Sequence, residues 1–159
     1  MAGIAAIRAG FPRLLGEFAI TSAESDYYNC IAWAAGDTAQ CWWPIRGYYW
    51  PPEVERQRTV ECFVAAFRIL GYESCGNAEF ETGYEKVAIY VDRLDRPTHM
   101  ARQLSTEWWT SKLGNGEDII HKIEGVEGPG VVGADYGRVV GVLRRPRAEV
   151  SSTETIQGI

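Results

Sequence analysis

The residue of this sequence best suited to nucleophilic chemistry is a cysteine that opens a short apolar segment. Cys30 follows Asp26 and Asn29 and begins the run CIAWAA, which Gly36 closes. Polar residues ahead of an apolar run are typical of a helix N-terminus, so we expect a short buried helix that starts at or near Cys30. The positive end of a helix stabilises a thiolate, and its free amides can hold a developing oxyanion. The alternative is that Cys30 is a small buried apolar side chain.

A thiolate nucleophile requires a base, and the chain has two histidines. His121 lies in a segment that we expect to be a short helix, where it would be solvated or would cap the helix. His99 instead opens a predicted strand, after a proline and a threonine. We therefore predict His99 as the base for Cys30. A thiol activated in this way should react with iodoacetamide faster than the other three cysteines of the chain.

The third candidate catalytic residue follows from the predicted register of a hairpin. If the turn STE pairs Leu104 with Trp108, Ser111 lies diagonally opposite His99 on the same face of the sheet. Ser111 or Gln103 could then orient the imidazole of His99. The predicted catalytic set is Cys30, His99 and Ser111.

An aromatic loop follows the predicted cysteine helix. From Cys41 to Pro52 the sequence CWWPIRGYYWPP has three prolines, a glycine and five large aromatic residues, which suits neither a helix nor a central strand. The loop could pack on the core or line a substrate cleft. The residues predicted to contact substrate are Tyr28, Asn29, Trp43, Trp50 and Gln103.

The rest of the chain predicts the elements that position these residues. A helix is expected from residues 52–53 to Leu70, because apolar residues recur at helical spacing from Val60 onward. Strands are expected at 86–91, 98–104, 108–113 and 138–143, and a short helix at 117–124. We predict an α+β, papain-like fold in which the two helices near the N-terminus pack against an antiparallel sheet. It forms one domain over residues 1–147, with a disordered tail over 148–159.

Charge and motifs exclude several classes of function. A net charge of -5 and a pI near 5.1 oppose binding to nucleic acid. The histidines and cysteines lack metal-ligand spacing, and the chain has neither a glycine-rich nucleotide loop nor a GxSxG turn. We therefore expect no metal, no cofactor and no nucleic acid. No segment reads as a signal peptide or a membrane span, so we expect a cytoplasmic protein, or one delivered by a specialised secretion system.

The motifs resemble known families. A cysteine on an early helix followed by a histidine on a later sheet is similar to the papain-like superfamily, including NlpC/P60 peptidases and OTU-type deubiquitinases, whose nucleophile has an Asp-x-Asn-Cys-Leu context. More closely, residues 11–147 resemble a bacterial family with no assigned activity that carries YNCIAWA, CWWP, EKVAIY, THMARQL and WTSKLG. NlpC/P60 enzymes place their histidine where this chain has Glu85 and Lys86.

Two functions of different classes fit these observations. The resemblance implies a cysteine-dependent hydrolase or acyl transferase that acts on an amide, isopeptide or carboxamide bond, with a peptide or protein as substrate. The alternative is a non-catalytic module that binds a peptide or protein through the aromatic loop, such as an accessory or effector domain of a bacterial conflict system.

Overall fold

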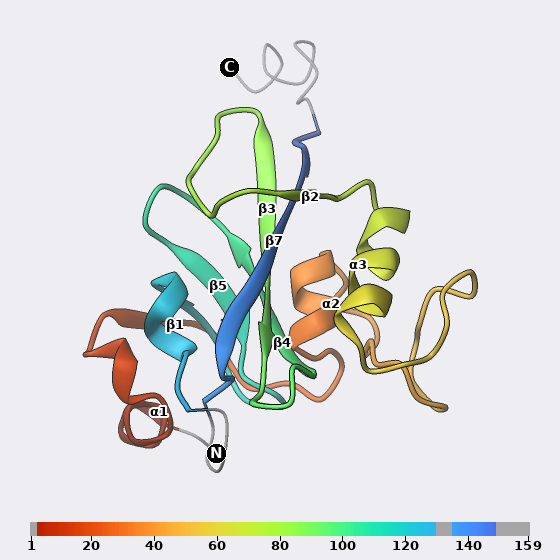
Figure 1. Cartoon of the computed structure of the whole chain (residues 1–159). Helices are drawn as coiled ribbons and strands as arrows, with labels where there is room; N and C mark the ends of the chain where they lie inside the picture. Colours follow the sequence, from red (N-terminus) through yellow and green to blue (C-terminus); the bar gives the residue numbers. More distant parts are fainter. Residues whose placement is uncertain (1–2, 130–134, 149–159) are drawn as a thin grey trace, which may run out of the picture.

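An antiparallel sheet forms the centre of the computed structural model, which describes residues 3–129 and 135–148 (Figure 1). In these residues seven strands lie in the order β1-β6-β5-β4-β3-β7-β2, and each hydrogen-bonded pair is antiparallel. The strands are β1 Phe18–Ser22, β2 Glu73–Cys75, β3 Tyr84–Val91, β4 Pro97–Gln103, β5 Trp109–Lys112, β6 Asp118–His121 and β7 Arg138–Pro146. The predicted α+β class is confirmed, with more strand than helix.

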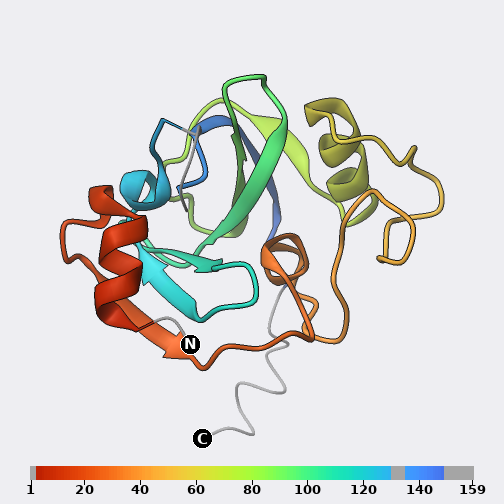
Figure 2. The same ribbon diagram turned by 90° about the horizontal axis from the view of Figure 1, so that it is seen from below.

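Helices cover both faces of this sheet (Figure 2). Helices α2 (Cys30–Ala35) and α3 (Val60–Ile69) pack on one face with residues such as Met100 and Val87. Helix α1 (Ile4–Gly10) and the 3-10 helices η1 (Pro12–Leu14) and η2 (Ile123–Val126) pack on the other, with Ala101 and Tyr90. Strand β3 is therefore buried on both faces from Val87 to Val91, which explains why this part of its sequence is a continuous apolar run.

Helix α2 begins at Cys30, as predicted. The side chain of Asn29 accepts a hydrogen bond from the amide of Ala32, and Gly36 ends the helix with a positive φ of 85°. Glycine adopts this left-handed conformation without the steric cost that a side chain would add. Cys30 thus occupies the first turn of a buried helix.

Helix α3 is shorter than predicted. It begins at Val60, because Thr59 caps it by accepting a hydrogen bond from the amide of Cys62. The expected start at residues 52–53 is wrong. The segment before Thr59 instead follows the aromatic loop, where the indole of Trp50 donates to the carbonyl of Glu55. Proline at the start of a pattern permits a helix, but the capping threonine decides where it begins.

The predicted helix at 117–124 is also wrong. Residues 118–121 form strand β6, which pairs with β1 on one side and with β5 on the other, and η2 follows from Ile123. Alternation in DIIH puts Asp118 and Ile120 on one face and Ile119 and His121 on the other. Four residues are too few to distinguish the two periods, so the partners available in the sheet decide.

All four strands that the sequence predicts are present, as β3, β4, β5 and β7. The hairpin between β4 and β5 has the predicted closure, since the amide of Leu104 donates to the carbonyl of Trp108 at 2.8 Å. Edge strands β1 and β2 were not predicted. The predicted tail lies almost wholly outside the described residues.

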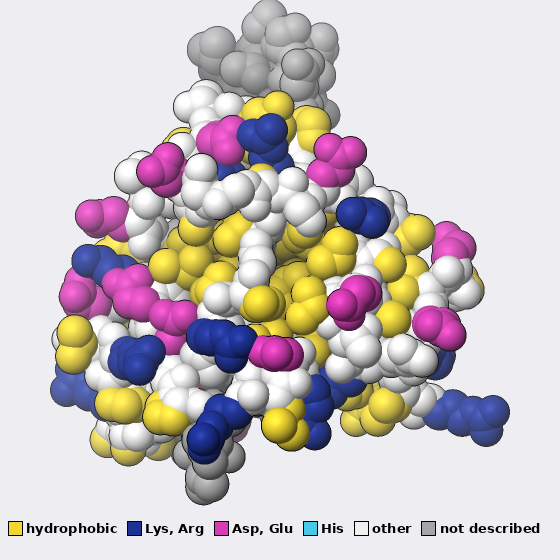
Figure 3. All heavy atoms as spheres, viewed as in Figure 1, with side chains coloured by type: hydrophobic (Ala, Val, Ile, Leu, Met, Phe, Trp, Pro, Cys, Tyr) yellow, Lys and Arg dark blue, Asp and Glu magenta, His cyan; other side chains and the backbone are white. Residues whose placement is uncertain are grey.

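On the face viewed in Figure 3, hydrophobic side chains gather near the centre and charged ones lie around them.

Candidate functional site

Cys30 lies where the hydrogen-bond ladder between β4 and β5 ends. The paired residues are Gln103 with Trp109 and Arg102 with Thr110. Amides along a strand alternate in direction, and that of Leu104 donates toward β5, so the amide of Met100 points to the same side. Met100 lies beyond the last of these pairs, and its amide hydrogen-bonds to the sulfur of Cys30 instead. The thiol therefore occupies the place that a longer β5 would fill.

The thiol is protonated at neutral pH. Burial raises the pKa of Cys30 to about 11, although the amides of Met100 and Ile31 and the charge of Lys112 oppose part of that rise. The side chain is 7% exposed. The predicted rapid alkylation of Cys30 is therefore not supported by its environment, because iodoacetamide reacts with the thiolate.

His99 is a buried, neutral imidazole. Its Nε2 atom lies 2.8 Å from the hydroxyl oxygen of Ser111, which is the contact that the hairpin register predicted. Its Nδ1 atom is buried and has no hydrogen-bond partner among the described residues. The ring stacks on Tyr136 with centroids 3.8 Å apart. Burial, followed by the charge of His121, lowers the pKa of His99 well below its usual value.

Cys30 and His99 approach β4 from different directions. Met100 packs in the core beside α2, so His99, its neighbour along the strand, faces the other side with Tyr90 and Tyr136. The backbone pairs between β4 and β5 end at Arg102 and Thr110, so no residue of β5 pairs with Met100. The structure thus brings the thiol to the backbone position next to His99, and Ser111 to the imidazole itself.

His121 is a member of this cluster that the sequence did not suggest. Its Nε2 atom lies 2.7 Å from the hydroxyl of Ser111, so Ser111 bridges two imidazoles. Both histidines and Ser111 are completely buried. The signal in the sequence was the two-residue alternation of DIIH, which places His121 on the same face as Ser111 once the segment is a strand.

Two of the predicted substrate-binding residues hold the segment that carries Cys30. Asn29 caps α2, accepts a hydrogen bond from the amide of Trp42 and donates to its carbonyl. The hydroxyl of Tyr28 donates to the carboxylate of Asp118 at 2.6 Å. Their polar atoms therefore join α2 to the aromatic loop and to β6.

The other three predicted substrate-binding residues are also engaged within the protein. Trp50 is buried and its ring meets Phe63 edge-on. Trp43 is half-buried against Phe63, with Arg58 over its ring. Gln103 is buried and donates to the carbonyl of Ala78. The structure does not bring these three together with Cys30 at one surface.

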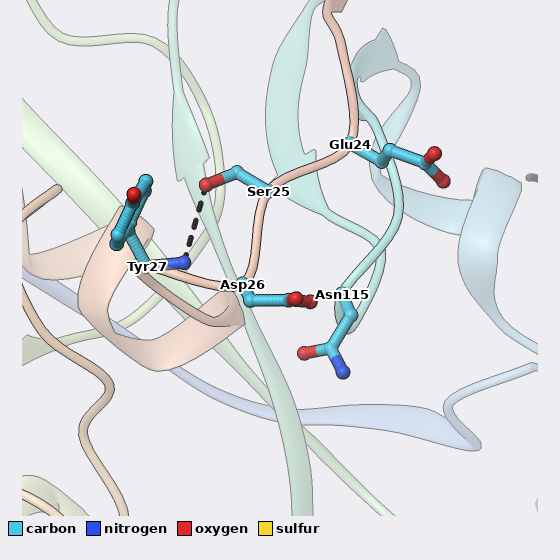
Figure 4. A pocket seen from close by; sticks show the side chains of 5 residues that line it. All are labelled: Glu24, Ser25, Asp26, Tyr27 and Asn115. Carbon is cyan, nitrogen blue, oxygen red and sulfur yellow. Dashed lines mark hydrogen bonds between the residues drawn. The ribbon is translucent and has the colours of Figure 1, made fainter.

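Two hollows adjoin the cluster. One, of about 590 Å³, is lined by the segment 24–27, which leads into α2, and by Asn115. Figure 4 shows the side chain of Asp26 directed toward Asn115 and that of Glu24 directed away. A smaller hollow of about 280 Å³ lies between α1, the loop after β5 and Tyr136. Neither Cys30 nor His99 lines these two hollows, so the pair is covered in the unliganded structure.

We expect Asn29→Ala to destabilise the protein more than the loss of a helix cap alone would. The variant loses the cap of α2, about 1 kcal/mol, and two hydrogen bonds to Trp42 worth about 1 kcal/mol each. Thr59→Ala is the matched control, because Thr59 caps α3 and its side chain makes no other hydrogen bond in the described residues. Urea denaturation should give a cost two to three times larger for Asn29→Ala; equal costs would contradict the anchoring role.

The buried histidines predict a loss of stability on mild acidification. Burial lowers the pKa of His121 to about 4, and that of His99 also falls. An unfolded histidine binds its proton near pH 6.5, so between pH 6.5 and 4 the unfolded state binds more protons than the folded state and is favoured. From pH 7 to pH 5 the free energy of unfolding should fall by about 2 kcal/mol through His121, and His99 should add to that fall. Urea denaturation should show a smaller decline for His121→Gln; an equal free energy at both pH values would contradict this account.

The described part of the chain has neither a candidate metal site nor a helix that could span a membrane. Residues 3–129 and 135–148 contain no group of three or more His, Cys, Asp or Glu that could hold a metal ion. Within the same ranges, none of the helices has the length and apolar character needed to cross a membrane.

Fold and site together define an α+β protein in which a buried cysteine begins a helix and two buried histidines are joined through a serine. A family model described as a domain of unknown function, DUF7689, matches residues 19–144, so the chain belongs to that family. Comparisons with curated proteins and with solved structures found no match.

Proposed function

We propose that the protein is a papain-like cysteine hydrolase or acyl transferase that attacks a peptide-type carbonyl through Cys30. The observation that carries the proposal is the arrangement of His99. Its Nε2 is bound to Ser111, and its Nδ1 is buried without a hydrogen-bond partner among the described residues. The next residue along β4, Met100, is the one whose amide hydrogen-bonds to the sulfur. One ring nitrogen is thus held in place and the other is left for a proton, as in a nucleophile, base and orienting residue arranged in series.

The proposed reaction begins from a neutral pair. As the sulfur bonds to the carbonyl carbon, the thiol proton passes to Nδ1 of His99, so no free thiolate is needed beforehand. This step requires the sulfur to turn toward the side of β4 on which the ring lies. The amides of Met100, Ile31 and Cys30, which act on the sulfur, are the backbone donors that we propose for the oxyanion that forms. The imidazolium then returns the proton to the leaving amine, and the carbon–nitrogen bond breaks to leave a thioester on Cys30.

The second half-reaction regenerates the enzyme. Water or an acceptor amine attacks the thioester carbonyl and gives its proton to Nδ1 of His99, which passes it to the departing sulfur. Water as acceptor makes the protein a hydrolase, and an amine makes it an acyl transferase. Tyr136, which stacks on His99, also lines the smaller hollow, which is the route that we propose for a substrate to approach the imidazole.

The proposal is tested with an activated ester, p-nitrophenyl acetate, which supplies an acyl group without requiring the natural substrate. We expect release of p-nitrophenolate in a burst of one equivalent per chain, followed by slower turnover, because a thioester accumulates before hydrolysis. Intact mass should increase by one acetyl group during the burst. A rate no greater than that of free cysteine, with no acetylated protein, would contradict the proposal.

A binding module is the second candidate, favoured by the tip of the aromatic loop. Ile45, Tyr48 and Tyr49 are exposed there, although Trp42 and Trp50 are buried. Exposed aromatic residues tend to dominate binding to peptides and proteins. For this candidate, Tyr48→Ser should abolish any phenotype that the protein confers on its host, while Cys30→Ser should leave it intact. The opposite pattern is expected for the enzyme.

A further inference from the structure

A chain of hydrogen bonds runs from the backbone carbonyl of Lys122 through His121 and Ser111 to His99. The carbonyl determines which group donates at each step. Nδ1 of His121 lies 2.5 Å from the carbonyl oxygen of Lys122. A carbonyl oxygen only accepts hydrogen bonds, so Nδ1 of His121 must carry a hydrogen. Burial lowers the pKa of His121 to about 4, which leaves the ring neutral at pH 7. A neutral imidazole has one hydrogen, so Nε2 of His121 is an acceptor.

Ser111 carries this order of donors and acceptors from His121 to His99. Its hydroxyl lies 2.7 Å from Nε2 of His121 and 2.8 Å from Nε2 of His99. The hydroxyl has a single hydrogen, which must go to His121, because Nε2 of that ring can only accept. Toward His99 the oxygen of Ser111 therefore presents a lone pair.

His99 must then donate from Nε2, and its single hydrogen resides there. We infer that His121, acting through Ser111, fixes the tautomer of His99 and leaves Nδ1 as its unprotonated nitrogen. His121 is a positioning residue, since it touches neither Cys30 nor the proposed position of the substrate. The buried Nδ1 without a hydrogen-bond partner is consistent with a bare lone pair, because a buried N–H group is left unpaired far less readily.

The consequence for chemistry rests on the proposed function. The thiol of Cys30 can give its proton only to a nitrogen with a lone pair, and the relay reserves Nδ1 for that purpose. Without the relay both tautomers of His99 are accessible, and only part of the population is ready to act as the base.

The tautomers are measured by nitrogen NMR of the imidazoles in protein labelled with nitrogen-15. The chain has two histidines, so the spectrum contains only two rings. At pH 7 we expect opposite tautomers, with the hydrogen on Nδ1 in His121 and on Nε2 in His99. Two rings in the same tautomer, or a hydrogen on Nδ1 of His99, would overturn the inference.

Variants test whether His121 is the cause. His121→Phe removes the acceptor for Ser111, and the single remaining ring should become a mixture of tautomers. His121→Gln can offer its amide oxygen at the place of Nε2 and should restore the hydrogen on Nε2 of His99. Gln103→Leu is the control, because Gln103 shares the strand and face of His99 but bonds to Ala78, so this variant should keep the wild-type tautomer. A pure Nε2–H tautomer in a folded His121→Phe variant would overturn the inference.

Acylation of Cys30 by p-nitrophenyl acetate separates this inference from the proposed function. If both hold, the rate should fall about tenfold or more in His121→Phe and recover in His121→Gln. Opposite tautomers in a wild-type protein that never acylates would reject the proposed function and support the relay. Normal acylation with equal tautomers in both rings would reject the relay and support the proposed function.

Discussion

Replacing Cys30 with serine is expected to eliminate the burst of p-nitrophenolate and the acetylated protein that accompanies it. The hydroxyl of serine is a far weaker nucleophile than a thiol. The volume changes little, and the new hydroxyl can still accept the hydrogen bond from the Met100 amide. Stability should therefore fall by only about 1 to 3 kcal/mol.

The control for this variant is Cys41→Ser. Cys41 is a half-exposed thiol at the start of the aromatic loop. Within the described residues its thiol donates a hydrogen bond to the carbonyl of Asp26. It should retain the burst at the wild-type rate. If Cys30→Ser kept the burst while Cys41→Ser lost it, the nucleophile would be Cys41 and the account of Cys30 would fail.

Replacing His99 with glutamine is expected to slow acylation of Cys30 by at least about 100-fold, which is the usual contribution of a general base. Glutamine can still donate a hydrogen bond to Ser111 in the place of Nε2, but it has no basic nitrogen in the place of Nδ1. The thiol of Cys30, whose pKa is about 11, would then have to lose its proton without a neighbouring base.

Thermal unfolding must accompany this kinetic comparison, because His99 also stacks on Tyr136 and contacts Tyr90. The account requires that the rate falls in a variant that still unfolds cooperatively. An unchanged rate in the folded variant would show that His99 is only a buried core residue.

The sequence predicted the parts of this cluster that depend on local rules. Asn29 and Gly36 set the two ends of α2, so the position of Cys30 on the helix followed from capping alone. The short STE turn fixed the register of β4 and β5, and with it the contact between His99 and Ser111. Each of these predictions needed only neighbours within a few residues or across one hairpin.

The parts that the sequence missed depend on distant partners. His121 joins the cluster because β6 lies between β1 and β5, and a four-residue segment carries too little pattern to reveal that. The burial of Trp50 and the anchoring role of Asn29 depend on how the aromatic loop folds, since Trp50 packs on Phe63 and the backbone of Trp42 bonds to Asn29. The raised pKa of Cys30 is likewise a property of the packed core, whereas the sequence suggested only the favourable end of a helix.

The most direct test of the central claim is to identify which thiol accepts an acyl group. The four cysteines are unpaired; Cys41 and Cys75 are half-exposed, and Cys30 and Cys62 are buried. After brief treatment with p-nitrophenyl acetate at pH 7, peptide mass mapping should find the acetyl group on Cys30 in the wild type and not in His99→Gln. Acetylation that follows exposure, on Cys41 and Cys75 with Cys30 unmodified, would contradict the account.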